Sequence, residues 1–482
     1  MKVLLTGVTG YIGKRLLPML LDEGHHLVCS VRDRNRMPDG FRNHARVSVV
    51  EVDFLQAESE GAIPQDIDAA YYLIHSMTSG RSDFSSLEAQ SAEAFVRGID
   101  RTSARQIIYL GGITPDKALS QHLASRKQVG DILRSSRVPV TELQAGIIIG
   151  SGSASFEIMR DLVEKLPVMI TPRWLDIRHQ PIAVRDVLNC LSGVLGRDDC
   201  MPGIFPIGGT EVLTYRQMLL VIARVRGLRR LIMTVPVMTP RLSSYWLYFI
   251  TSTSYPLAVQ LVHSMKIEVL AGDGSLAERL GIERTPYEVA VRRAFQVMEE
   301  DAVPSSWKDA LSSSASPVTL PAGTEVPEYG VYRDLREMEI PADEERVLDN
   351  IWSIGGERGW YAADFLWHMR GMLDSMVGGV GLRRGRTNRS TIHPGDAIDF
   401  WRVLAADRSD KRLLLFAEMK VPGEAWLEFR IVTSGGRSLL RQTATFRPRG
   451  LSGRLYWYVV MPFHALIFGT MCRRIITYRE NP

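Results

Sequence analysis

A glycine-rich turn directly after the first predicted strand constrains this chain more than any other sequence feature. The strand covers residues 2–6, the turn runs from Thr6 to Gly13 (TGVTGYIG), and a helix is predicted over residues 12–21. In such a turn Gly7 permits the tight bend, Gly10 lets the backbone approach a pyrophosphate, and Gly13 lets helix and strand pack closely. Exposed N–H groups at the helix start bind the anion. The turn therefore predicts a phosphate-bearing ligand, with Thr9, Tyr11 and Ile12 also beside it.

The first 300 residues alternate short apolar runs with helical segments. Further strands are predicted at residues 26–31, 47–52, 69–74, 106–110 and 140–144, and a second helix at residues 86–101. This alternation indicates an α/β fold with a doubly wound parallel sheet. Residues 1–300 are expected to form one domain, in which residues 151–300 supply most of a smaller substrate lobe.

The pattern changes after residue 300. Residues 301–330 hold six Ser and four Pro, which is typical of a linker. In residues 331–482, helices are predicted at 343–354, 362–376 and 451–476, and strands at 397–404, 413–420, 425–433 and 438–447. Consecutive strands accompanied by helices predict an α+β domain with an antiparallel sheet.

Composition and charge exclude several classes of protein. The chain has 482 residues, of which 45% are hydrophobic and 23% charged, as in ordinary globular proteins. Residues 331–482 carry 23 basic and 18 acidic side chains without a dense basic block, so no nucleic-acid partner is expected. The four cysteines are scattered without metal-ligand spacing, and the N-terminal apolar run is too short for a signal peptide. No metal and a cytoplasmic location are therefore expected.

The G-x-x-G-x-x-G spacing of residues 7–13 resembles the short-chain dehydrogenase/reductase superfamily, most closely its atypical, extended branch, through about residue 300. The resemblance implies an NAD(P)-binding Rossmann domain that transfers hydride. It also implies that Asp53, which ends the third strand, meets the adenine. Leu73 and His75, after the fourth strand, would pass the cofactor ribose, although His75 equally fits an ordinary loop histidine. Gly111, after the fifth strand, would also lie at the cofactor.

The choice between NADP and NAD depends on the end of the second strand, which reads SVRDR over residues 30–34. An acidic residue there would hold a ribose diol. Arg32 and Arg34 could instead bind a 2′-phosphate through charge-assisted contacts. NADP is therefore favoured, and Asp33 keeps NAD possible.

The catalytic pattern departs from the superfamily, which uses a Ser after the fifth strand and a Tyr-x-x-x-Lys on the next helix. Gly111 and its neighbour Gly112 stand where the Ser is expected, and His122 and Arg126 occupy the Tyr and Lys positions. His122 could donate a proton near neutral pH, although a cation one turn away disfavours imidazolium. Two alternatives stay open: His122 only positions cofactor or substrate, or Ser125 and Lys127 form the working pair.

Residues 331–482 resemble an uncharacterised domain with a START-like (polyketide-cyclase-like) fold, on residues 354–361 (IGGERGWY) and the final aromatic helix. The resemblance implies an apolar cavity with a hydrophobic ligand. Five tryptophans fit a pocket or an ordinary core equally well: Trp360, Trp367, Trp401, Trp426 and Trp457. The apolar run 455–472 is interrupted by Pro462 and flanked by arginines, so it predicts a domain-covering helix, and peripheral membrane contact is not favoured.

These features favour an NADP(H)-dependent oxidoreductase acting on a hydrophobic small molecule. A redox sensor or scaffold that binds NADP(H) without turnover is the alternative suggested by the missing Ser and Tyr. A third hypothesis is a lipid- or quinone-binding protein regulated by the nucleotide.

Overall fold

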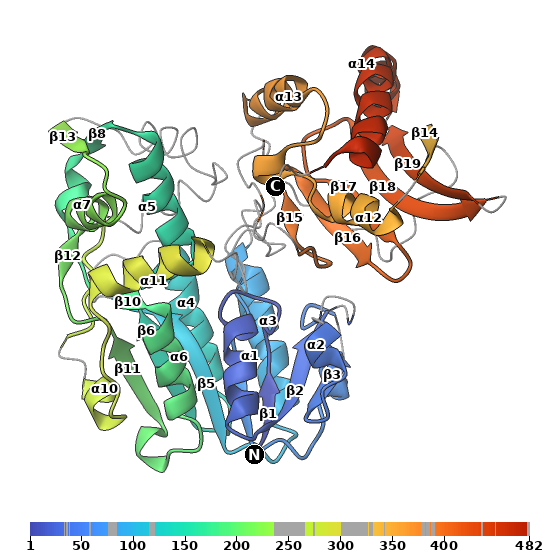
Figure 1. The fold of residues 1–482 in the computed structure, drawn as a ribbon. Coiled ribbons are helices and arrows are strands. Elements are labelled where there is room, and N and C mark those ends of the chain that lie inside the picture. The colour runs from blue at the N-terminus through green and yellow to red at the C-terminus, as the bar shows by residue number, and fades with distance from the viewer. Residues whose placement is uncertain are drawn as a thin grey trace. The chain divides into compact units, whose positions relative to one another are not determined.

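The computed structural model describes residues 1–32, 34, 37, 39–56, 59–75, 84–114, 121–235, 266–272, 275–299, 326, 331–341, 343–376, 381, 386, 391–434, 437–448 and 450–479. The chain divides into two compact units, residues 1–313 and 314–482, which we describe separately (Figure 1). The predicted linker lies outside the described residues, apart from residue 326.

A parallel sheet of seven strands forms the centre of the first unit (Figure 1). Its strands pair in the order β11-β6-β5-β4-β1-β2-β3, and every pairing is parallel. The strands are β1 (Lys2–Leu5), β2 (His26–Val31), β3 (Val47–Glu51), β4 (Ala69–Tyr72), β5 (Gln106–Gly112), β6 (Val140–Ala145) and β11 (Gly203–Ile207). The predicted α/β fold with a parallel sheet is confirmed. Strand β11 was not predicted, because its sequence GIFPI combines Gly and Pro, which a sheet tolerates at an edge.

Helices cover both faces of this sheet. On one face, α1 (Gly13–Asp22) and α6 (Val184–Gly193) bury their apolar sides against β1 and β2. On the other face, α3 (Phe84–Ile99) and α4 (Gln121–Leu133) pack against β4 and β5. Successive residues of β1 therefore face different cores, with Val3 and Leu5 towards α1 and Leu4 towards α3.

The elements after residue 150 build a further core beside the sheet. Helices α5 (Ala154–Lys165), α7 (Tyr215–Val225) and α11 (Tyr287–Glu299) pack around Phe156, Met218 and Val291. The short strands there pair as β7 (Ile148–Ile149) with β10 (Ile182–Ala183), β9 (Arg178–His179) with β12 (Leu213–Thr214), and β8 (Val168–Pro172) with β13 (Leu231–Val235). The remaining helices are α2 (Asp39–Arg42) and α10 (Ser275–Arg279).

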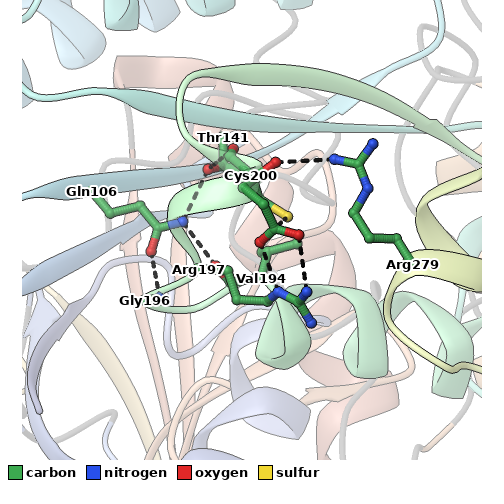
Figure 2. Close-up of polar contacts among 8 residues, drawn as sticks. Gln106, Thr141, Val194, Gly196, Arg197, Cys200 and Arg279 are labelled. Carbon is green, nitrogen blue, oxygen red and sulfur yellow. Dashed lines mark hydrogen bonds and ion pairs between the residues drawn. The ribbon is translucent and has the colours of Figure 1, made fainter.

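A buried polar network ties the loop after α6 to the first residues of β5 and β6 (Figure 2). The Gln106 amide donates to the Thr141 hydroxyl at 2.9 Å and to the Val194 carbonyl at 2.9 Å, and it accepts from the Gly196 N–H at 2.7 Å. The Thr141 hydroxyl donates in turn to the Cys200 carbonyl at 2.8 Å. This network lies at the amino ends of the strands, so it stabilises the end of the sheet opposite the glycine turn.

The second unit contains an antiparallel sheet of six strands in the order β14-β19-β18-β17-β16-β15. Its strands are β14 (Tyr332–Glu339), β15 (Ala397–Ile398), β16 (Trp401–Asp407), β17 (Arg412–Ala417), β18 (Gly423–Ser434) and β19 (Arg437–Pro448). Its helices are α12 (Glu344–Trp352), α13 (Asp364–Met376) and α14 (Gly450–Thr477). The predicted α+β class is confirmed, while the START-like assignment stays a prediction.

One strand of this unit was not predicted, and one predicted strand is divided in two. Strand β14 was missed because its sequence YRDLREME is mostly charged, as edge strands often are. The single strand predicted over residues 397–404 is split into β15 and β16, because Asp399 adopts a φ of +52° and reverses the chain.

The five tryptophans singled out from the sequence are all buried. Trp360, Trp367 and Trp401 pack with Phe400 in the main core of this unit, and Trp426 packs with Phe416 in a second cluster. These four tryptophans therefore contribute to packed cores, and Trp457 stacks on Tyr332 and Phe446.

Helix α14 is long and apolar but not straight. No single helix in the described part of the chain is long and apolar enough to cross a membrane. The segments 452–464 and 467–477 of α14 reach that threshold only as a pair, with a bend of 44° between them.

Candidate functional site

Two of the three glycines in the turn are required by the fold itself. Gly7 has a φ of +64°, and a Cβ there would lie 2.5 Å from the Leu73 carbonyl oxygen. A Cβ on Gly13 would overlap the Gly7 carbonyl. A Cβ on Gly10, by contrast, would meet only the Gly7 carbonyl oxygen at 3.1 Å. Gly7 and Gly13 are thus needed by the chain, whereas Gly10 leaves backbone accessible to a ligand.

Thr6 and Leu73 form the base of this turn. The buried Thr6 hydroxyl donates to the Tyr71 carbonyl at 2.9 Å and accepts from the Leu73 N–H at 3.1 Å. This side chain therefore joins the ends of β1 and β4. The Thr6 hydroxyl is therefore used within the fold, and contact of Thr6 and Leu73 with a cofactor stays a prediction.

Tyr11 connects the turn to the loop after β7. The Arg15 guanidinium lies 4.3 Å from the centre of the Tyr11 ring and donates to the Ser151 carbonyl at 2.7 Å. Burial raises the pKa of Tyr11 to about 12, so its hydroxyl stays protonated.

Ile12 precedes α1 and offers no side-chain cap. Thr9 is half-buried in the turn.

The two arginines at the end of β2 have different surroundings. The Arg34 guanidinium donates to the Val49 carbonyl at 2.8 Å, and its backbone N–H donates to Glu51 at 2.9 Å, so Arg34 is bound to β3. Arg32 is exposed and makes no ion pair with a described carboxylate. Arg32 is therefore the better candidate for a 2′-phosphate, and Asp33 lies outside the described residues.

Asp53 is half-buried directly after β3, where the predicted adenine contact places it. One carboxylate oxygen accepts from the Leu55 N–H at 3.2 Å, and its carbonyl accepts from the Ser59 hydroxyl at 2.5 Å. These bonds fix the turn after β3 and orient the carboxylate.

A buried carboxylate that sequence reasoning missed joins three elements beside the turn. Glu88 on α3 lies 2.9 Å from Nδ1 of His75, which follows β4, and accepts a hydrogen bond of 2.5 Å from the Ser125 hydroxyl on α4. Burial, reinforced by the nearby Arg126, lowers the pKa of His75, while Glu88 opposes this shift. His75 is therefore a fixed, neutral imidazole near pH 7. The sequence does contain a signal for this residue. Glu88 is acidic, yet it lies on the same apolar face of the helix as Ala92 and Phe95, at the spacing i, i+4, i+7.

Arg126 lies against the end of β5. Its guanidinium donates to the Leu110 carbonyl at 2.6 Å, and its own carbonyl accepts from the Tyr109 hydroxyl at 3.1 Å. A Cβ on Gly112 would lie 3.5 Å from Arg126 Cδ, and one on Gly111 would lie 3.0 Å from Glu142 Oε1. Gly111 therefore makes room for the Glu142 carboxylate, whereas the Arg126 contact at Gly112 is an ordinary van der Waals distance.

The other residues proposed for catalysis are placed differently. His122 lies in the first turn of α4, and its side chain is outside the described part of the structure. Ser125 is buried at Glu88, whereas Lys127 is exposed. The structure therefore does not bring Ser125 and Lys127 together as a working pair.

Two family models match separate parts of the chain. Residues 7–162 match a family described as NAD(P)H-binding, and residues 329–471 match a family described as a protein of unknown function (DUF2867). A search of curated proteins found no match.

Solved structures that are similar to this chain include a reductase and an epimerase. The triphenylmethane reductase of Citrobacter sp. is 15% identical over 61% of this chain and 100% of that chain, with a TM-score of 0.50. Its complex with NADP(H) is 16% identical over 61% and 99%, also with a TM-score of 0.50. The UDP-glucuronic acid 4-epimerase of Bacillus cereus, in complex with UDP-glucuronic acid and NAD, is 14% identical over 62% and 99%, with a TM-score of 0.47.

Residues 7–162 of the first unit therefore form an NAD(P)H-binding domain of Rossmann-like fold, a fold that the triphenylmethane reductase shares. A DUF2867 domain is fused to it as the second domain. The resemblance and the class of cofactor predicted from the sequence are confirmed at this level.

Proposed function

We propose that this protein is an NADP(H)-dependent oxidoreductase that transfers hydride to or from a hydrophobic small molecule. The observation that carries the proposal is the convergence of Arg126, His75 and the buried Glu88 beside the glycine turn of an NAD(P)H-binding domain. Parallel α/β sheets bind their ligands at the carboxyl ends of the strands, where these residues lie. NADP is favoured over NAD because Arg32 is exposed where a 2′-phosphate would bind.

The residues present fit the cofactor. Backbone around Gly10 is open to a pyrophosphate, and Asp53 and His75 border the expected adenine and ribose positions. The bound nicotinamide supplies or accepts a hydride, and reduction of a carbonyl also places a proton on the oxygen. Glu88 holds His75 in one orientation, and the Arg126 guanidinium keeps a positive charge at the end of β5. His122 is the proposed proton donor, one helical turn before Arg126.

Incubation with NADPH and a panel of carbonyl, enone and quinone compounds tests the proposal. Oxidation of NADPH with at least one class of compound is expected. Binding of NADPH without its oxidation by any compound of the panel would refute the proposal that the protein is an oxidoreductase.

A second candidate function is a redox sensor that binds NADP(H) without turnover. It is favoured by Gly111 and Gly112 in place of the usual Ser, and by the Arg126 guanidinium, which is bonded to the Leu110 carbonyl. For a sensor, NADPH and NADP should differ in affinity while no compound of the panel is reduced.

The DUF2867 domain is the proposed site of a hydrophobic ligand, such as a lipid or quinone, if its fold is START-like. Native mass spectrometry of protein purified from cells should then show a co-purifying ligand of lipid size. Repeated absence of such a ligand would contradict this part of the proposal.

A further inference from the structure

Two helices of the second unit expose an unusual number of large apolar side chains. Phe365 on α13 is 74% exposed, and Leu455 on α14 is 66% exposed. The full set, which we call the α13–α14 face, is Phe365, Met369, Met372, Leu373, Leu455, Tyr458, Val459, Met461 and Phe463. Among the other large apolar side chains described in this unit, only that of Leu335 is comparably exposed.

The two helices form one connected surface. The Arg370 guanidinium of α13 lies 5.3 Å from the centre of the Tyr456 ring of α14, and the Trp367 and Phe468 rings are 6.4 Å apart. Both helices lie at the same end of the second unit (Figure 1). The exposed side chains therefore lie on two neighbouring helices that contact each other.

The shape of this area favours lipid over a single protein partner. At 3.6 residues per turn, the exposed apolar positions of α14 between Leu455 and Phe463 cover roughly 200° of the helix circumference. A helix that packs on one protein surface typically presents an apolar stripe of about 100°. Only a narrow side, which includes Gly453 and Trp457, is buried against the unit. A convex surface that is apolar over so wide an arc suits a fluid phase that can surround it.

The second half of α14 limits how deep such contact can go. Ile467, Met471 and Ile475 are buried in the core of the unit. This half is therefore held by the protein, whereas the first half, before the 44° bend, contacts the unit on one side only, through the Trp457 ring stacked on Tyr332 and Phe446. The geometry fits insertion into the interfacial layer of a bilayer and not a crossing.

Charges of both signs lie at the border of the α13–α14 face, because Asp364 beside Phe365 is exposed as well as Arg454. Residues 455–472 contain no charged side chain, and Arg454 just before them is exposed without a described carboxylate partner. On α13, Arg370 borders the same area, whereas Asp364 and Asp374 accept hydrogen bonds from backbone N–H groups. Arginines beside an exposed apolar surface attract anionic phospholipid headgroups.

We propose that the α13–α14 face docks on the surface of an anionic phospholipid bilayer, with its apolar side chains in the interfacial layer and Arg454 among the headgroups. This reverses the expectation from the sequence, in which peripheral membrane contact was not favoured. The inference rests on the second unit alone and is independent of the proposed oxidoreductase activity.

Vesicle flotation of the full chain tests the proposal. We expect the protein to float with vesicles of phosphatidylcholine and phosphatidylglycerol, less with phosphatidylcholine alone, and less at high salt, because salt screens the arginines. The double variant Val459→Glu/Phe463→Glu should reduce the bound fraction at least tenfold. Leu335→Glu is the matched control. Tyr332 of β14 stacks on Trp457 of α14, and successive residues of a strand point to opposite faces. Leu335, three positions after Tyr332, therefore faces away from α14.

A Tyr458→Trp variant supplies a readout that does not depend on disrupting the face. Its fluorescence should shift to shorter wavelength when anionic vesicles are added, and circular dichroism should show all variants to be folded. The proposal is overturned if the parent protein does not float, or if the double variant floats as well as the parent. It is also overturned if the double variant only converts a self-associated protein into a monomer, because the face would then join two copies of the chain.

Discussion

The carboxylate of Glu88 lies 2.9 Å from Nδ1 of His75 and accepts a hydrogen bond of 2.5 Å from the Ser125 hydroxyl. One buried side chain of α3 thus holds the loop after β4 and the helix after β5, on the two strands whose ends border the proposed nicotinamide position. A buried carboxylate with two such donors both stabilises the fold and fixes the imidazole.

Replacing Glu88 should therefore affect stability and nucleotide binding together. Glu88→Gln removes the charge, so we expect the free energy of unfolding to fall by about 1–3 kcal/mol. The pKa of His75 should fall further, because Glu88 raises it. Denaturant unfolding, NADPH titration and NMR titration of His75 measure these effects. Glu93→Gln on the exposed side of α3 is the control, and equal behaviour of the two variants would contradict the assigned role of Glu88.

Two glycine substitutions should separate the fold from the binding site. Gly13→Ala should destabilise the domain by about 1–3 kcal/mol, since its Cβ would overlap backbone of Gly7 and Val8. Gly10→Ala should lower the melting temperature less than Gly13→Ala, because its Cβ would meet only the Gly7 carbonyl oxygen at 3.1 Å, yet weaken NADPH binding at least tenfold, since the turn is predicted to bring the Gly10 backbone close to the pyrophosphate. Thermal unfolding and isothermal titration calorimetry measure both. Unchanged affinity in Gly10→Ala would show that the ligand does not approach this turn.

The two arginines after β2 should differ in their effect on cofactor preference. Arg32→Asp should weaken NADPH about ten- to a hundredfold while NADH is little affected, because a charged contact to the 2′-phosphate is replaced by repulsion. Arg34→Ala should have a smaller effect, because its guanidinium is bonded to the Val49 carbonyl. Equal losses of NADPH and NADH in Arg32→Asp would refute the assignment of the 2′-phosphate.

Much of this fold follows from sequence pattern. The six strands predicted in the first unit are all present, because each is a short apolar run next to a helix or turn. Strand β11 and strand β14 escaped prediction, since the first carries Gly and Pro and the second is mostly charged. Both lie at sheet edges, where pairing with one neighbour decides the structure and local pattern does not.

The candidate site was only partly predictable, because some of its contacts are local in sequence and others join distant segments. The glycine turn is a local motif, so its position could be read directly. The contact of Glu88 with His75 and Ser125 joins three segments of the chain, and the spacing of Ser125 and Lys127 did not show that one is buried and the other exposed. Contacts between distant segments depend on tertiary packing, which one sequence does not display.

The second unit should lose stability in mild acid because of His464. Burial lowers the pKa of His464 from 6.5 to about 4, and nearby Arg370 and Arg336 act in the same direction, while Asp334 opposes them. As the pH falls from 7 to 5, the unfolded chain binds a proton that the folded chain does not, so the free energy of unfolding should fall by about 2 kcal/mol.

Denaturant unfolding of the parent and of His464→Leu, followed by tryptophan fluorescence, checks this prediction. His464→Leu cannot titrate, so its loss of stability between pH 7 and pH 5 should be smaller by that amount. Identical pH dependence in the two proteins would show that His464 does not control acid stability.

Isotope transfer tests the central claim, hydride transfer by this domain, most directly. NADPH deuterated at C4 of the nicotinamide, on one face or on the other, would be incubated with the protein and each carbonyl and enone compound, whose reduced products keep the transferred hydride on carbon. The products would be analysed by mass spectrometry, with Gly10→Ala as the control. The account predicts that the parent protein transfers deuterium to the reduced product from only one of the two faces of the nicotinamide. It also predicts far less product with Gly10→Ala. Tight binding of NADPH with no deuterium in any product would contradict it and leave the sensor as the function of this domain.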